Sequence, residues 1–181
     1  SPKPVWYTGL NFGNLSTNNC HICPDYVVFQ SDRDELVPNI IRTRLNGLWG
    51  IQLTKDGSNV SPVFNFQGSQ IAFASNRDGD WEIYRMDHEG NSELNVTKHS
   101  ESADLAPSWE CFWIAFQSDR DGNWEIYKTN PSGTEQIRLT DDPAADEHPS
   151  WAPDSQRIAF ASNRGGNWDL YIMDQDGRNV E

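Results

Sequence analysis

The sequence has no long apolar run and few basic residues. No stretch approaches the roughly 18 to 20 apolar residues that a membrane-spanning helix requires. No charged and apolar leader stands at the start, so we expect a soluble chain, either cytoplasmic or the mature form of an exported protein. The 14 basic residues face 27 acidic ones, giving a formal net charge of −13. Because binding to nucleic acid needs clustered Lys and Arg, this balance argues against a nucleic-acid partner and favours a basic protein surface or a cation.

Cysteine is also scarce. Cys20, Cys23 and Cys111 are too few and too irregularly spaced for a disulfide framework. Cys20 and Cys23 form a CxxC motif, but no second CxxC supplies further zinc ligands, and Pro24 stands where a haem-attachment histidine would be. We therefore interpret the thiols as structural or incidental. A disulfide and a metal or redox role are the alternatives, and the odd count leaves at least one thiol unpaired.

The sequence contains one repeating unit in four copies. The segment IAFASNRDGDWEIY begins at Ile71 and returns in close variants at Ile114 and Ile158, and a diverged copy, VVFQSDRD, begins at Val27. A period in the forties is typical of stacked or ring-closed arrays, in which no unit can cover its own apolar faces. We therefore expect a single domain over residues 1–181.

Each unit carries the pattern of an antiparallel meander. Large apolar residues alternate with small or polar ones in runs such as RIAFASN and WDLYIMD, and Gly, Asp, Asn and Pro break the chain every 8 to 12 residues or so. A fourth run follows as GIQLT, ELNVTK or QIRLTD. The sequence thus predicts an all-β protein of four-stranded sheets packed radially, the blades of a β-propeller. The expected units are about 20–54, 62–97, 107–140 and 149–181.

The phase of the repeat predicts how the blades close. The Leu-Thr or Val-Thr pair of a fourth strand would next fall at about position 183, so the final unit lacks its outer strand. Residues 5–10, VWYTGL, stand at the complementary phase. We predict that they pair beside Trp168–Met173 and close a ring of four blades. Two alternatives remain open: a homodimer that forms an eight-bladed ring, and a fragment of a larger propeller.

The fixed spacings within the unit carry a family resemblance. The segment HPSWAPDSQRIAFASNRGGNWDLYIMDQDG, His148 to Gly177, resembles the repeat of TolB-like β-propellers, and the resemblance extends over roughly residues 20–181. It implies a non-catalytic propeller in the periplasm or at the cell surface, which binds a protein partner through its face and channel. Related blades cap the active site of prolyl-oligopeptidase-type enzymes. On this resemblance we expect the given sequence to differ from the family in holding four blades rather than six or more, and in not including TolB's helical N-terminal domain.

Two loops break the repeat and suggest a binding site. HSESADLAP begins at His99 and DDPAADEHP at Asp141, and both lead into an innermost strand on one face of the ring. We expect them to form an acidic rim that attracts a basic protein or peptide, because rigidly held propeller loops are usual binding positions. The alternative is a solvated acidic surface. The rim residues are Glu101, Asp104, Asp141, Asp142, Asp146, Glu147 and His148.

The hairpins Ser75–Trp81, Ser118–Trp124 and Ser162–Trp168 place oxygen-bearing side chains at alternate positions, a spacing found in calcium loops. A calcium loop would have Gly at the sixth position, whereas Gly122 is the fourth residue of its run. We therefore favour turn chemistry, with calcium as the one possible cofactor. The candidate metal ligands are Asp78, Asp80, Asp119, Asp121 and Asn123.

Signatures of catalysis are absent. The sequence contains no GxSxG elbow, no HExxH and no Gly-rich phosphate loop, and its four histidines fall at unrelated phases of the repeat. The repeated Trp81, Trp124 and Trp168, like the repeated tyrosines, suit packing between blades better than sugar stacking. We predict a non-enzymatic binding scaffold. The alternatives are a carbohydrate-binding or carbohydrate-active propeller, such as a polysaccharide lyase or hydrolase, and a structural unit of a larger assembly.

Overall fold

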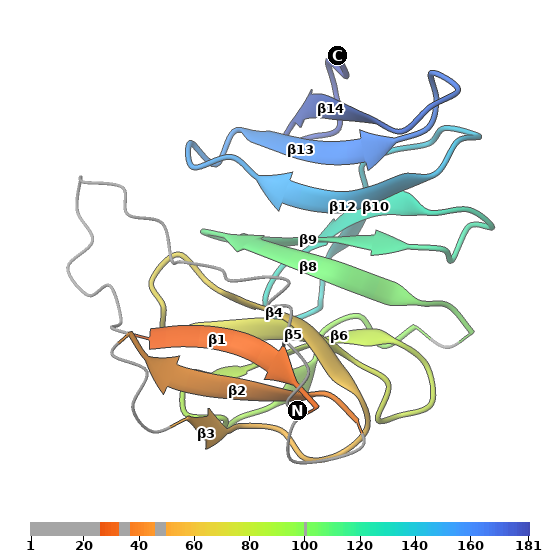
Figure 1. The fold of residues 1–181 in the computed structure, drawn as a ribbon. Helices are drawn as coiled ribbons and strands as arrows, with labels where there is room; N and C mark the ends of the chain where they lie inside the picture. Colours follow the sequence, from red (N-terminus) through yellow and green to blue (C-terminus); the bar gives the residue numbers. More distant parts are fainter. Residues whose placement is uncertain (1–25, 33–36, 46–49, 100) are drawn as a thin grey trace, which may run out of the picture.

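A computed structural model describes residues 26–32, 37–45, 50–99 and 101–181 (Figure 1). Within these ranges the chain forms only β-strands, arranged in four antiparallel sheets, as predicted. The described ranges contain no helix with the length and hydrophobicity needed to cross a membrane.

The four sheets follow one another along the chain, and we name them blades 1 to 4. Blade 1 holds β1 (Tyr26–Ser31), β2 (Asn39–Arg44) and β3 (Ile51–Gln52). Blade 2 holds β4 (Asn59–Phe64), β5 (Gln70–Ser75), β6 (Glu82–Asp87) and β7 (Leu94–Asn95). Blade 3 holds β8 (Asp104–Glu110), β9 (Trp113–Ser118), β10 (Glu125–Thr129) and β11 (Gln136–Arg138). Blade 4 holds β12 (Asp146–Trp151), β13 (Arg157–Ser162) and β14 (Asp169–Asp174).

The blades stack face to face in chain order, and blades 1 and 4 lie at opposite ends of the stack (Figure 1). The predicted closing strand, residues 5–10, lies outside the described residues, so ring closure stays a prediction. The outer edge of β14 already has one partner. Ile172 and Glu181 exchange backbone hydrogen bonds of 2.9 and 3.0 Å, at the place where Lys128 pairs with Ile137 in blade 3.

Alternation along the strands gives every blade two different faces. The face turned to the next blade carries the smaller side chains, as Ala72, Ala74 and Ile83 do in blade 2. The face turned to the preceding blade carries the larger ones, such as Trp109 and Phe116 in blade 3. We call these the small face and the large face. The small face of one blade packs against the large face of the next, which forms the cores between blades 1 and 2, 2 and 3, and 3 and 4.

Two contacts recur where neighbouring blades meet. A glycine with positive φ in the turn after the third strand lies against the residue that follows the fourth strand of the preceding blade, as Gly133 does against Val96 and Gly177 against Leu139. A cationic side chain on the third strand contacts the following blade, whereas the glycine contacts the preceding one. Arg42, Arg85 and Lys128 each donate to a backbone carbonyl of the next blade, at His88, Pro131 and Gln175.

Candidate functional site

The predicted binding loops meet the tight turns of the blades at one edge of the stack. The turns are residues 76–81, 119–124 and 163–168, and the loops between blades are residues 98–103 and 141–145, of which residue 100 is not described. Backbone N–H groups of the loops donate to turn side chains: Ala103 to Asp119 Oδ1 at 2.7 Å and Ala145 to Asn163 Oδ1 at 3.0 Å. We call this combined surface the acidic edge.

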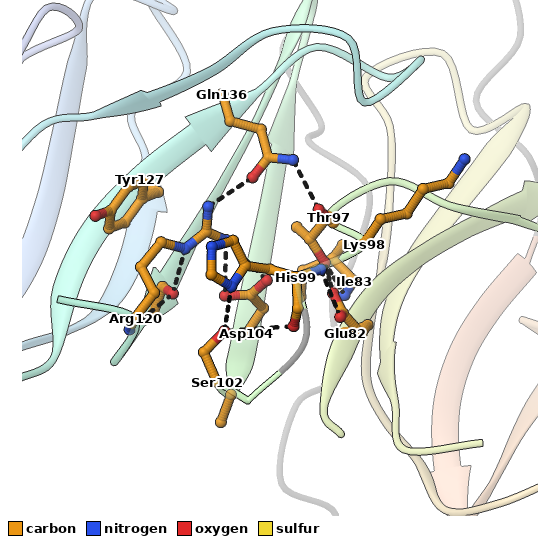
Figure 2. Close-up of polar contacts among 12 residues, drawn as sticks. Glu82, Ile83, Thr97, Lys98, His99, Ser102, Asp104, Arg120, Tyr127 and Gln136 are labelled. Atoms are coloured by element: carbon orange, nitrogen blue, oxygen red, sulfur yellow. Dashed lines mark hydrogen bonds and ion pairs between the residues drawn. The ribbon is translucent and has the colours of Figure 1, made fainter. Parts of the chain in front are cut away.

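An arginine on each turn is folded back into its blade rather than exposed on the acidic edge. Arg120 donates from Nε to Ser118 Oγ at 2.8 Å and from Nη2 to Asp104 Oδ2 at 2.9 Å. Its guanidinium carbon lies 4.6 Å from the ring centre of Tyr127, close enough for a cation–π contact. Figure 2 shows this guanidinium held between the carboxylate of Asp104 and the amide of Gln136.

The same arrangement recurs in the neighbouring blades and explains the repeated Ser-x-Arg. Arg164 pairs with Asp146 at 2.7 Å, and Arg77 donates to Asn59 Oδ1 at 2.9 Å. Each also lies over the ring of its blade's tyrosine. The most conspicuous cations of the repeat are therefore internal structural groups.

This geometry corrects part of the predicted rim. Asp104 and Asp146 have fully buried side chains that are ion-paired to Arg120 and Arg164, so neither belongs to an exposed acidic surface. The sequence placed them in loops, but they begin the innermost strands β8 and β12. Their backbone N–H groups donate to the carbonyls of Trp81 and Trp124 in the preceding blade.

The other predicted rim residues lie at the surface in differing settings. Glu101 is exposed, and its backbone N–H donates to Asp80 Oδ2 at 3.0 Å. Asp141 is exposed and pairs with Arg138 at 2.8 Å, whereas Asp142 is half-buried. Glu147 and His148 lie on β12, where their side chains approach to 3.8 Å. The structure thus keeps the acidic loops together and places the Glu147–His148 pair on an innermost strand.

A buried carboxyl that the sequence analysis did not single out lies beneath the acidic edge. Glu82, at the start of β6, accepts hydrogen bonds from the Thr97 hydroxyl and from the backbone N–H of His99 (Figure 2). Burial, with a smaller contribution from the charge of Asp104, raises the pKa of Glu82 to about 7 despite the Thr97 hydrogen bond that lowers it. The signal was present in the sequence, since an acid follows the repeated Trp in each of the last three units.

The equivalent carboxyl of blade 3 has a cation that Glu82 lacks. Glu125 accepts from Thr140 at 2.6 Å and also pairs with Arg138 at 2.9 Å. The position of Arg138, opposite the blade's tyrosine, is occupied in blade 2 by Asn95. Beneath the loop between blades 2 and 3, the structure therefore holds a buried carboxyl without this guanidinium, which makes that interface differ from the next one.

The candidate calcium ligands serve as turn acceptors and donors. Asp78 and Asp121 accept the phenol hydrogens of Tyr84 and Tyr127. Asn123 donates to the carbonyls of Asp142 and Ala144, both at 2.8 Å. Across the described part of the chain, no group of three or more His, Cys, Asp or Glu side chains is arranged to hold a metal ion.

The remaining predictions have mixed outcomes. Tyr84 and Tyr127 are buried, each stacked on a phenylalanine of its own blade, as packing residues would be. Trp168 is 53% exposed, unlike its counterparts in blades 2 and 3. Cys111 is an exposed free thiol. Cys20 and Cys23 lie outside the described residues.

The comparisons with known proteins agree with this geometry. A family model described as the TolB beta propeller domain matches residues 14–140. A putative TolB from Agrobacterium tumefaciens superimposes with a TM-score of 0.78 at 24% identity, covering 87% of this chain and 60% of that structure. TolB from Acinetobacter baumannii gives 0.71 at 21%, covering 87% of this chain and 40% of that structure.

A propeller enzyme is also structurally similar. An oligogalacturonate lyase from Vibrio parahaemolyticus gives a TM-score of 0.67 at 16% identity, covering 87% of this chain and 48% of that structure. At such low identity, these likenesses show the fold alone. The chain spans about three fifths or less of each structure named here. Among curated proteins, no relative matches.

Proposed function

Because the chain belongs to the TolB beta propeller domain family, we propose that it is a non-enzymatic scaffold that binds a basic protein or peptide segment at its acidic edge. Propellers of this kind hold short loops rigidly at the end of stacked sheets, which suits them to recognition. By the same resemblance, we propose a periplasmic or extracellular location. A ring closed by residues 5–10 would complete the channel beside this edge.

The observation that carries the proposal is the unequal pairing of charge at the acidic edge. Arg77, Arg120 and Arg164 are folded into their blades. Asp80 and Glu101, in contrast, form no ion pair with any described residue and are exposed. Carboxylates of one sign gathered on a rigid surface create a potential that steers basic partners and favours their binding.

The negative charge of the acidic edge argues against an acidic carbohydrate as the ligand. An oligogalacturonate carries a carboxylate on each sugar, and a surface with unpaired acids would repel it. With the Asp104 and Asp146 carboxylates committed to arginines, neither is free as a catalytic acid or base in the described fold. A non-enzymatic scaffold therefore remains the proposal.

Peptide binding tests the function directly. A Lys-rich peptide of about ten residues should bind more tightly than a peptide in which Gln replaces every Lys, and the affinity should fall as salt is raised. The double variant Glu101→Gln/Asp142→Asn should weaken binding about 10-fold, because each charge at the rim of a contact contributes about 0.5 to 1 kcal/mol.

A matched control lies on the opposite edge of the stack. Glu89→Gln/Asp176→Asn removes the same two charges from turns after β6 and β14, both exposed. This variant should bind the Lys-rich peptide as the unaltered protein does. Equal weakening by both double variants would show that net charge, and not the acidic edge, attracts the peptide, and the proposed site would be wrong. Preferential binding of oligogalacturonate would favour the carbohydrate alternative instead.

A further inference from the structure

The buried carboxyls of blades 2 and 3 are held in the same way. Glu82 and Glu125 occupy equivalent positions at the start of the third strands, and each accepts a hydrogen bond from a threonine hydroxyl. Through Oε1, each also accepts from a backbone N–H of the loop that follows, His99 at 2.7 Å for Glu82 and Asp142 at 3.1 Å for Glu125. The two carboxyls can therefore be compared donor by donor.

Glu125 has two further donors, one of them a cation that reaches the surface. Its Oε1 accepts from Asn123 Nδ2 at 3.1 Å and from Arg138 Nη2 at 2.9 Å. The guanidinium of Arg138 also donates to Asp141 at 2.8 Å and lies 3.3 Å from Asp121. The Arg138 side chain is 31% exposed. One guanidinium thus neutralises a buried carboxylate and contacts two carboxylates at the surface.

Glu82 lacks both of these donors. Asp80 stands two residues before it, in place of the asparagine, and an ionised carboxylate has no hydrogen to donate. Asn95 stands in place of the arginine and donates to the phenol oxygen of Tyr84 instead, at 3.3 Å. Within the described ranges, Glu82 Oε1 keeps one N–H donor where Glu125 Oε1 has three, and no cation forms an ion pair with Glu82. Because Glu82 is only 5% exposed, this shortfall is costly when the group is ionised.

The cations near Glu82 do not supply the missing donor. Arg77 and Arg120 are ion-paired to other carboxylates of their own blades. Lys98 lies in the loop after the threonine, and Figure 2 shows its side chain extending away from the Glu82 carboxyl. A guanidinium at this place would therefore come from another molecule.

We propose that blade 2 binds an arginine side chain of the basic segment at the place where blade 3 holds its own arginine. We call this place the Glu82 site, formed by Glu82, Asp78, Asp80 and Asn95. The inference rests on the proposed function and specifies the residue that the segment presents. A guanidinium is planar and directs five N–H donors outward, so it can serve buried and exposed carboxylates together, whereas the ammonium of lysine is a compact and strongly hydrated charge. The exposed carboxylates here are those of Asp78 and Asp80, in the turn before Glu82.

Two peptides of equal length and charge test the proposal, one with Arg and one with Lys at every basic position. At about pH 8, above the pKa of Glu82 of about 7, the Arg peptide should bind at least about 5-fold more tightly in calorimetry. Asn95→Arg supplies the guanidinium from the chain itself, as blade 3 does, so the two affinities should become equal. Asn167→Arg adds the same charge to the exposed turn of blade 4 and should weaken the binding of both peptides while keeping the preference.

A small probe separates this site from the peptide-binding function. Methylguanidinium should shift the amide resonance of His99, whose N–H donates to Glu82, at lower concentrations than methylammonium does, and Asn95→Arg should abolish the difference. Equal binding of the Arg and Lys peptides, or a preference that Asn95→Arg leaves unchanged, would overturn the inference and leave the proposed function standing. If neither peptide binds, the proposed function is wrong, and absence of the His99 shift with methylguanidinium would then overturn the Glu82 site as well.

Discussion

The carbonyl oxygen of Val96 lies 2.4 Å from the point where a Cβ on Gly133 would stand. Gly133 belongs to the turn after the third strand of blade 3, and Val96 to the fourth-strand segment of blade 2. Gly133 also has a φ of 72°, a region that L side chains rarely adopt. One glycine thus meets both the conformational need of its own turn and the close approach of two blades.

We therefore expect Gly133→Ala to destabilise the fold by about 3 kcal/mol or more, because a methyl group would meet backbone that cannot move aside cheaply. Gly122→Ala is the control, since its φ is 104° and nothing lies within 4 Å of its added Cβ. It should cost only the backbone strain, about 1 to 2 kcal/mol. Urea denaturation of both variants measures the difference, and equal losses would contradict the close contact.

Glu82 should make the stability depend on pH. Its pKa is about 7 in the folded protein and about 4.5 in the unfolded chain, so the folded state holds the proton more tightly. The contribution of Glu82 to the free energy of unfolding is then greatest below about pH 4.5 and falls as pH rises to about 7. The full decline is about 3 kcal/mol.

Glu82→Gln isolates this contribution, since the amide keeps the size of the side chain and does not ionise. Relative to the unaltered protein, the variant should gain stability between pH 4.5 and pH 7, and the gain should level off above pH 7. Denaturant unfolding at a series of pH values measures it. Parallel curves for the two proteins over this window would show that Glu82 ionises in the fold as readily as in the unfolded chain.

Asn95→Arg should lower the pKa of the Glu82 carboxyl. It brings a guanidinium to the place that Arg138 holds beside Glu125, at 2.9 Å. An adjacent cation favours the ionised form, so the pKa of Glu82 should fall toward 4.5. In the Asn95→Arg background, the pH-dependent difference made by Glu82→Gln should shrink by at least about 1 kcal/mol. No change in that difference would mean that the new arginine does not reach Glu82.

The buried pair of Arg120 and Asp104 should be sensitive to the loss of the cation. Arg120→Met leaves the Asp104 carboxylate buried and unpaired, and we expect a loss of about 3 to 5 kcal/mol. The double variant Asp104→Asn/Gln136→Glu should cost far less, about 1 kcal/mol, because it reproduces blade 2, where Asn59 and Glu93 together face Arg77. Thermal and urea unfolding measure both. Similar losses for the two variants would contradict the argument that an unpaired charge dominates.

The sequence predicted the blades well because their signals are local. Alternation of apolar residues and the turn residues of RDGN and its variants indicate the second and third strands, and these strands run as expected in blades 2 to 4. The fourth strands are short, two or three residues each, yet they fall where the Leu-Thr and Val-Thr pairs indicated.

Asp104 and Asp146 were predicted to lie in loops because the composition around them resembles that of a loop. Each begins a strand that pairs within its own blade, Asp104 with Ser118 and Asp146 with Ser162, and its backbone N–H also donates to a tryptophan carbonyl of the preceding blade, which is a tertiary contact. A subtler signal was available. Asp or Asn followed by two residues and a proline recurs at Asn59, Asp104 and Asp146, and a side chain repeated at one phase is a structural residue more often than a binding one.

The arginine and its partners have a wider consequence. Arg120 takes its serine, its carboxylate and its stacking rings from one blade, so this cluster is complete within a single unit. The contacts that require a neighbour are different ones, among them the glycine contact, the forward-reaching cation, the tryptophan carbonyl that accepts from Asp104 and the apolar core between blades. A gene that gained or lost one whole unit would keep every internal cluster intact and need to restore only the contacts at a single interface between blades. Because the clusters are complete within each unit, the number of units can change during evolution while the unit itself stays constant.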